Sequence, residues 1–136
     1  MILVDHEDLD RYAEVLCDLK APIAERVDSL FCLRSFKQLE ALDVLFKAFE
    51  IEKDSELLQH EICYCLGQMD CTDEHVAKIQ TFLENIVEGD YAQIIVHEAV
   101  EALGNMSDDN TIKLLEKYRG SDKEISEMVV ETCELA

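Results

Sequence analysis

The sequence contains no tryptophan, one proline and four glycines, and it is poor in basic side chains, with 12 Lys and Arg against 31 Asp and Glu. So little proline and glycine excludes a collagen-like or loop-dominated chain and leaves room for long helices. The formal net charge of −19 argues against nucleic acid and anionic membranes as partners, because an acidic surface repels phosphate. This charge favours a basic protein or another cation as partner.

Long apolar runs are also missing. The apolar run at residues 1–4 is too short for a signal peptide, and no stretch approaches the length of a membrane span. The six cysteines lie mostly within apolar helical patterns, which favours buried, reduced thiols in a cytoplasmic protein over disulfides. Cys63 and Cys65 are two residues apart on a predicted helix and point to nearly opposite sides. We therefore do not expect them to hold a metal together.

Hydrophobic residues make up 49% of the chain and recur with helical spacing, while no segment shows sustained period-two alternation. Capping residues and glycines divide this pattern into eight predicted helices. We therefore predict an all-α fold. The helices are expected at about residues 5–19, 22–34, 36–50, 55–69, 74–87, 90–106, 109–118 and 122–136.

The second helices of successive pairs align on one leucine. These leucines are Leu33, Leu66, Leu103 and Leu135, at spacings of 33, 37 and 32 residues. This is the period of a short HEAT-like repeat, in which each helical hairpin packs on its neighbours. We predict that residues 1–136 form a single HEAT-like repeat domain, a solenoid of four helical hairpins.

Two of these second helices contain the same sequence motif. The segments HEICYCLGQMD, residues 60–70, and HEAVEALGNMSDD, residues 97–109, each start with His-Glu and reach Leu-Gly on the same count. The first and last repeats carry Val27 and Val129 at the histidine position, so they are interpreted as structural flanks. One His-Glu pair on a helix is usually a solvated patch, but two copies in register favour a functional site.

Equivalent positions on stacked helices form a line along one face, and adjacent helix axes lie about 8–10 Å apart. The imidazoles of His60 and His97 can therefore close on one ion. A carboxylate from Glu61 or Glu98 completes the two-histidine, one-carboxylate set that suits oxygen-activating iron(II). Zinc and manganese accept the same ligands. The other glutamate is then available for a substrate or an imidazole N–H.

Three other residues near the motifs have simpler interpretations. His6 and His75 lie near predicted helix starts without a repeat partner, so we expect both on the surface. Tyr64, within the first motif, is either a core residue or faces a substrate.

At these motifs the sequence resembles the deoxyhypusine hydroxylase family of HEAT-repeat iron enzymes. The resemblance extends beyond the two motifs to RVDSLFCLR, residues 26–34, and to LLEKYRGSDKEISEMVVETCELA, residues 114–136, so it covers nearly the whole chain. It implies an oxidoreductase of hypusine biosynthesis, a deoxyhypusine monooxygenase. Such an enzyme hydroxylates the deoxyhypusine side chain of translation initiation factor five A with dioxygen at a non-haem di-iron centre.

The resemblance also implies roles for individual residues. His60, His97 and Glu98 are expected to be the metal ligands of one iron, and Glu61 is expected to bind the cationic amine of the substrate. A carboxylate suits that task, because a buried ammonium needs a paired anion.

The family's chain is longer and contains two such lobes, and this sequence resembles the N-terminal lobe. Iron(II) is expected as cofactor, two per assembled enzyme and one per lobe. The chain is then a fragment of a longer enzyme, a half that pairs with itself or with a separate C-terminal half, or a relative that has lost the chemistry. An isolated half is expected to bind metal without turnover. The alternative function is a non-catalytic HEAT-repeat scaffold that binds a basic protein partner.

Overall fold

The computed structural model describes residues 6–36, 39–69, 73–106 and 116. Within these residues the chain forms helices and no strand, which confirms the predicted all-α fold and the first six predicted helices. The seventh and eighth predicted helices, and the fourth hairpin that they would form, lie outside the described residues. The six helices are α1 (His6–Leu16), α2 (Ile23–Arg34), α3 (Leu39–Ile51), α4 (Glu56–Gln68), α5 (Asp73–Glu88) and α6 (Gln93–Met106).

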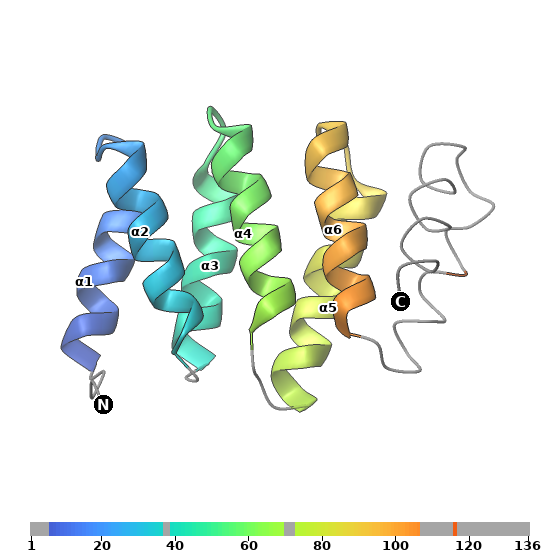
Figure 1. The fold of residues 1–136 in the computed structure, drawn as a ribbon, viewed down its shortest axis with the longest axis horizontal. Helices are drawn as coiled ribbons and strands as arrows, with labels where there is room; N and C mark the ends of the chain where they lie inside the picture. Colours follow the sequence, from blue (N-terminus) through green and yellow to red (C-terminus); the bar gives the residue numbers. More distant parts are fainter. Residues whose placement is uncertain (1–5, 37–38, 70–72, 107–115, 117–136) are drawn as a thin grey trace.

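The six helices form three antiparallel hairpins stacked side by side (Figure 1). Within each hairpin the two helices pack together, and each hairpin packs on the next through α1 on α3, α3 on α5, α2 on α4 and α4 on α6. The result is two layers of helices, with α2, α4 and α6 in one layer and α1, α3 and α5 in the other. This confirms the solenoid for the three described hairpins.

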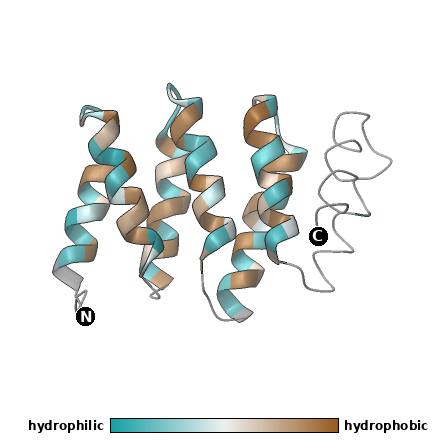
Figure 2. Ribbon diagram, in the orientation of Figure 1, coloured by the Kyte–Doolittle hydropathy of each residue, from teal (hydrophilic) through white to brown (hydrophobic). Residues whose placement is uncertain are grey.

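The core lies between the two layers, because hydrophobic residues recur on each helix at the spacing that turns them inward (Figure 2). The three repeat leucines in the described part, Leu33, Leu66 and Leu103, are completely buried. The leucine alignment therefore identified equivalent core positions. Phe82 of α5 stacks on Phe46 of α3 and meets Phe49 of α3 edge to face, at ring-centroid distances of 4.4 and 5.2 Å, and these contacts join the second hairpin to the third.

The prediction that the first helix continues to residue 19 is wrong. α1 ends at Leu16, and the following turn is held by Asp18, whose side chain accepts from the Lys20 N–H at 2.9 Å and whose carbonyl accepts from the Ala21 N–H at 3.1 Å. Aspartate hydrogen-bonds its own neighbouring backbone readily, so it competes with helix propagation here. Leu19 is left 58% exposed.

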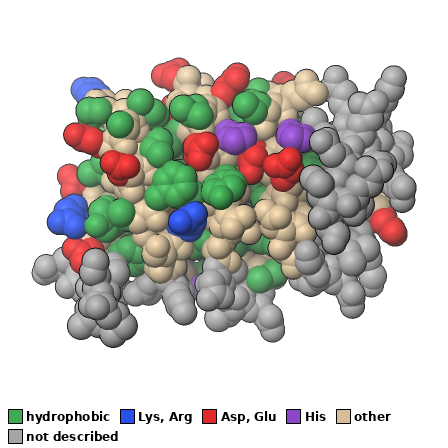
Figure 3. All heavy atoms as spheres, in the orientation of Figure 1, with side chains coloured by type: hydrophobic (Ala, Val, Ile, Leu, Met, Phe, Trp, Pro, Cys, Tyr) green, Lys and Arg blue, Asp and Glu red, His purple; other side chains and the backbone are tan. Residues whose placement is uncertain are grey.

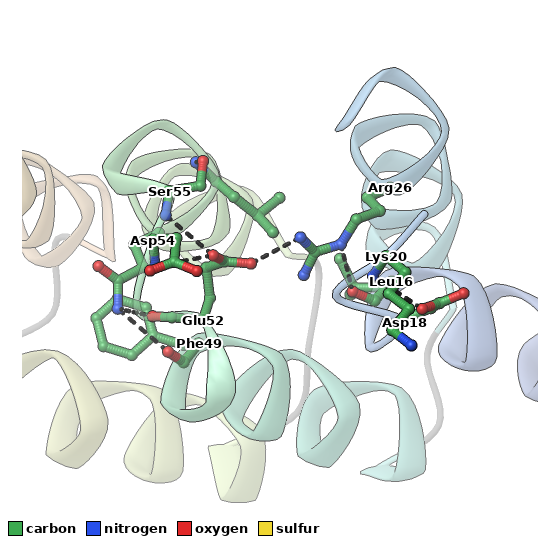
Figure 4. A network of polar contacts seen from close by, with 10 residues as sticks. Leu16, Asp18, Lys20, Arg26, Phe49, Glu52, Asp54 and Ser55 are labelled. Carbon is green, nitrogen blue, oxygen red and sulfur yellow. Dashed lines mark hydrogen bonds and ion pairs between the residues drawn. The ribbon is translucent and has the colours of Figure 1, made fainter. Parts of the chain in front are cut away.

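A buried polar network ties the first hairpin to the second (Figure 4). The Arg26 guanidinium lies 2.7 Å from the Glu52 carboxylate, with both side chains at most 5% exposed, and it also donates to the Leu16 carbonyl at 3.0 Å. Glu52 in turn accepts from the backbone N–H groups of Asp54 and Ser55 at 3.1 and 2.9 Å. The network therefore fixes the end of α1 and the α3–α4 turn relative to each other.

Helices α4 and α6 approach closely at a glycine. A Cβ atom added to Gly67 would lie 2.8 Å from both the Cα and the Cβ of Ala102, so no larger residue fits without a backbone shift. Gly67 of the first Leu-Gly pair thus has a packing reason: it lets the neighbouring helices α4 and α6 of one layer come together.

No helix in the described part is long and apolar enough to cross a membrane.

Candidate metal centre

The two histidines of the repeated motif project from neighbouring helices on the same face of the molecule. His60 lies in α4 and His97 in α6, and Figure 3 shows two histidine side chains over these helices with acidic side chains beside them. The start of α4 is well defined, because the Ser55 hydroxyl caps it by accepting from the Leu58 N–H at 3.1 Å. The predicted alignment of the two repeats along one face is therefore confirmed.

His60 and Glu98 form the closest contact of the site. His60 Nε2 lies 2.9 Å from Glu98 Oε2, across the packed pair α4 and α6. The Glu98 side chain is only 10% exposed, and burial raises its pKa. His60 and His97 act in the opposite direction, and the charge of Glu101 adds to the rise. Glu98 thus sits in an environment that disfavours a carboxylate unless a cation faces it.

Glu61 lies on the other side of the His60 ring. Its Oε1 is 3.4 Å from His60 Nδ1, and both side chains are about one-quarter exposed, at 26% and 24%. His60 Nδ1 itself is buried and makes no hydrogen bond to any described residue, because this contact lacks hydrogen-bond geometry. The imidazole of His60 therefore lies between two carboxylates, one near each ring nitrogen.

His97 is paired with a residue that the sequence analysis did not single out. Its Nε2 lies 3.5 Å from Oε1 of Glu101, one helical turn further along α6. Glu101 occupies the repeat position held by Tyr64 in α4, so the motif comparison alone did not draw attention to it. The spacing of four residues from a candidate ligand on one helix face was the signal that could have found it.

Comparisons with known proteins support the resemblance at these motifs. The chain is 34% identical to human deoxyhypusine hydroxylase over 134 residues and 35% identical to the deoxyhypusine hydroxylase of Debaryomyces hansenii over 144 residues, covering 98% and 99% of this chain. The structure of human deoxyhypusine hydroxylase in complex with glycerol superposes with a TM-score of 0.77 over 95% of this chain, at 34% identity. The chain is homologous to the deoxyhypusine hydroxylases.

The similarity spans only part of those relatives. This chain covers 41% of the human deoxyhypusine hydroxylase sequence and 44% of the Debaryomyces one. It covers 42% of the human chain in the solved structure. No protein-family model matches the chain. The chain therefore matches less than half of the length of each of these relatives.

The side chains of this candidate centre can be tested against the demands of a metal ion. Within residues 6–36, 39–69 and 73–106, no three His, Cys, Asp or Glu side chains already converge on one point. The donor types nevertheless suit iron(II), which accepts imidazole nitrogen and carboxylate oxygen. Two ligands at right angles on such an ion, each about 2.1 Å from it, lie about 3 Å apart. The His60–Glu98 contact of 2.9 Å matches this separation.

The surroundings of His60 Nδ1 are compatible with a metal at Nε2. A metal-ligating imidazole usually donates its other N–H to a carboxylate, and Glu61 lies 3.4 Å from this nitrogen, although the contact lacks hydrogen-bond geometry. We conclude that the residues fit a metal, with His60 and Glu98 at ligand spacing and His97 needed to complete the set. That His60, His97 and Glu98 hold a metal stays a prediction.

The cysteines next to the centre are inert. Cys63 and Cys65 are free and completely buried, as predicted. Burial raises the pKa of Cys65 to about 12 and raises that of Cys63 still further, with the charge of Glu98 adding to the rise at Cys63. Neither thiol ionises near neutral pH, so neither competes with imidazole or carboxylate for a cation.

The predictions about three further residues, His75, His6 and Tyr64, have different outcomes. His75 was expected on the surface, and this is wrong: it is 8% exposed, because the start of α5 turns it toward the body of the molecule. The side chain of His6 lies outside the described part of the structure. Tyr64 is 38% exposed, so it belongs to the surface beside His60 and not to the core.

Proposed function

We propose that this chain is one lobe of a deoxyhypusine monooxygenase, which hydroxylates the deoxyhypusine side chain of translation initiation factor five A in the cytoplasm. The observation that carries the proposal is the 2.9 Å contact between His60 and Glu98 on equivalent helices, in a chain whose relatives over 98% of its length are deoxyhypusine hydroxylases. Iron(II), when bound, would supply the activation of dioxygen that hydroxylation of an unactivated carbon requires.

The residues of this chain have separate tasks in the proposal. His60 and His97 provide neutral nitrogens and Glu98 the carboxylate that would hold the iron. Glu61 binds the ammonium group of the substrate side chain through charge and hydrogen bonding. It lies 3.4 Å from His60 Nδ1, so the substrate ammonium would be bound beside the proposed metal ligands.

The proposal includes a second lobe. The chain offers one set of two histidines and glutamates, so the di-iron centre that the family resemblance implies needs a second set from elsewhere. This set comes from another copy of the chain, from a separate C-terminal half or from the remainder of a longer protein. A two-fold homodimer would present two identical His-Glu faces to each other.

Iron loading under anaerobic conditions tests the proposal. Wild-type protein is expected to retain about one iron per chain, and His60→Ala, His97→Ala and Glu98→Ala are expected to lose it. Glu61→Gln should keep the iron and lose affinity for the deoxyhypusine-bearing factor. Turnover is expected only where two lobes assemble. A wild-type protein without iron, or equal iron loss in Glu61→Gln, contradicts the proposed division of roles.

The second candidate function is a non-catalytic HEAT-repeat scaffold that binds a basic protein. It is favoured by the absence of a converged three-residue metal set within the described residues and by the acidic charge of the chain. The variant His60→Ala separates the two functions. A scaffold would keep its affinity for the basic partner in this variant and would hold no iron before or after the change. The enzyme lobe would lose its iron.

A further inference from the structure

The two layers of the solenoid differ in how much apolar surface they expose. Among the described helical residues, the exposed large hydrophobic side chains are Ile23, Leu57, Tyr64 and Ile94. All four lie on α2, α4 or α6, and none lies on α1, α3 or α5. A single exposed apolar residue needs no explanation, but confinement of all four to one layer does.

Two of these residues occupy the same place in consecutive repeats. Leu57 and Ile94 are the second residues of α4 and α6, and they are 58% and 50% exposed. Each precedes the histidine of its motif by three residues, which places it one helical turn away on the same side of the helix. Figure 3 shows apolar side chains over the starts of these two helices, next to the histidines.

The polar centre is thus bordered by apolar surface along the helix direction. Tyr64 follows His60 by four residues and lies on the other side of the centre from Leu57. The carboxylates of Glu61 and Glu98 contact His60 between these apolar positions, and Glu101 contacts His97 at the α6 position that corresponds to Tyr64. A ligand that fits this surface must bring a positive charge to the centre and apolar groups to its border.

We propose that Leu57 and Ile94 form a docking strip for the polypeptide that carries the cationic side chain into the centre, so that recognition includes the carrier protein as well as its amine. This inference rests on the proposed function and names how that substrate is held. A basic polypeptide is the occupant that charge complementarity selects, because the chain carries a net charge of −19 and the carboxylates of Glu61 and Glu98 lie one helical turn from Leu57 and Ile94. A free diamine would meet the carboxylates and leave the strip exposed.

The double variant Leu57→Ser with Ile94→Ser tests the strip by calorimetric titration with the deoxyhypusine form of translation initiation factor five A. Serine is well tolerated in the first turn of a helix, so the variant is expected to fold. We expect at least a tenfold loss of affinity for the factor and unchanged iron content. Leu19→Ser is the control, because Leu19 has the residue type and the 58% exposure of Leu57 and lies in the α1–α2 loop of the first hairpin, outside α4 and α6.

Each outcome decides the inference. Unchanged affinity in the double variant overturns it, and so does an equal loss in Leu19→Ser or a wild-type protein that does not bind the factor. If light scattering shows that the double variant turns a dimer into a monomer while affinity for the factor is unchanged, the strip belongs to a second copy of the chain and the inference is overturned. Iron content in the same samples reports separately on the proposed function.

Discussion

At the scale of single residues, Glu98 shows a conflict between stability and function. Burial raises its pKa, so the folded protein must ionise this carboxyl in a place that disfavours the charge. At a pH below the ordinary pKa of glutamic acid, Glu98 is protonated in both the folded and unfolded states and does not lower the free energy of unfolding. As the pH rises through the raised pKa, the folded state loses stability relative to the unfolded state.

Replacement of this carboxyl should therefore stabilise the metal-free protein. We expect Glu98→Gln to raise the free energy of unfolding at pH 7 by on the order of 1 kcal/mol, the usual size of a change at one buried polar group, and to abolish iron binding. Urea unfolding at pH 4 and pH 7 measures the effect, which should be present only at the higher pH. Glu50→Gln, at an exposed position of α3, is the control and should change little. A destabilised Glu98→Gln protein at pH 7 contradicts this account.

The residues of the centre also show what sequence reasoning can reach. The repeat alignment predicted the shared face of His60 and His97 because equivalent positions of stacked helices must form a line. It did not find Glu101, because its repeat equivalent is Tyr64 and the two have no chemistry in common. It misplaced His75, because the direction of one side chain at a helix start depends on how the helix is tilted against its neighbours and not on spacing alone.

At the scale of helices, the close approach of α4 and α6 is what brings His60 to Glu98. Alanine normally favours a helix over glycine by about 1 kcal/mol. At Gly67 the added Cβ would lie 2.8 Å from the Cα and Cβ atoms of Ala102. Overpacking of this kind typically costs about 1–3 kcal/mol. We expect Gly67→Ala to lower the free energy of unfolding and to weaken iron binding, because the two helices must move apart.

Gln68→Ala provides the control for this change. Gln68 is the next residue of α4 and is exposed, so alanine there gains helix propensity without meeting α6. Urea unfolding and iron titration of both variants separate packing from propensity. Equal iron affinity in Gly67→Ala and the wild type would show that iron binding by the proposed ligands does not depend on the spacing of α4 and α6.

At the scale of the whole molecule, the repeat period was sufficient to predict the stacking of hairpins, because a solenoid needs only local contacts between neighbours. The ion pair between the first and second hairpins could not be predicted in this way. Arg26 of α2 and Glu52 of the α3–α4 turn are not at equivalent repeat positions. Periodicity describes helices, whereas this contact joins a helix to a turn and includes the carbonyl of Leu16 at the end of α1.

The buried ion pair leads to a prediction about the entire fold. Glu52→Gln keeps an oxygen that can accept from the Asp54 and Ser55 N–H groups but removes the charge that faces Arg26, leaving a buried guanidinium without its anion. Breaking one side of such a pair typically costs about 3–5 kcal/mol, whereas exposed pairs contribute about 0–1 kcal/mol. We expect Glu52→Gln to lower the free energy of urea unfolding by about 3 kcal/mol.

Asp8→Asn, which breaks the exposed pair with Arg11, is the matched control and should have almost no effect. The double variant Arg26→Gln with Glu52→Gln should lose less than the sum of the two single variants, because neither charge is then left alone in the interior. If the losses simply add, the two side chains act independently. The stability of the stacked hairpins would then come from the separate contacts of Arg26 and Glu52 with the backbone, and not from the ion pair drawn in Figure 4.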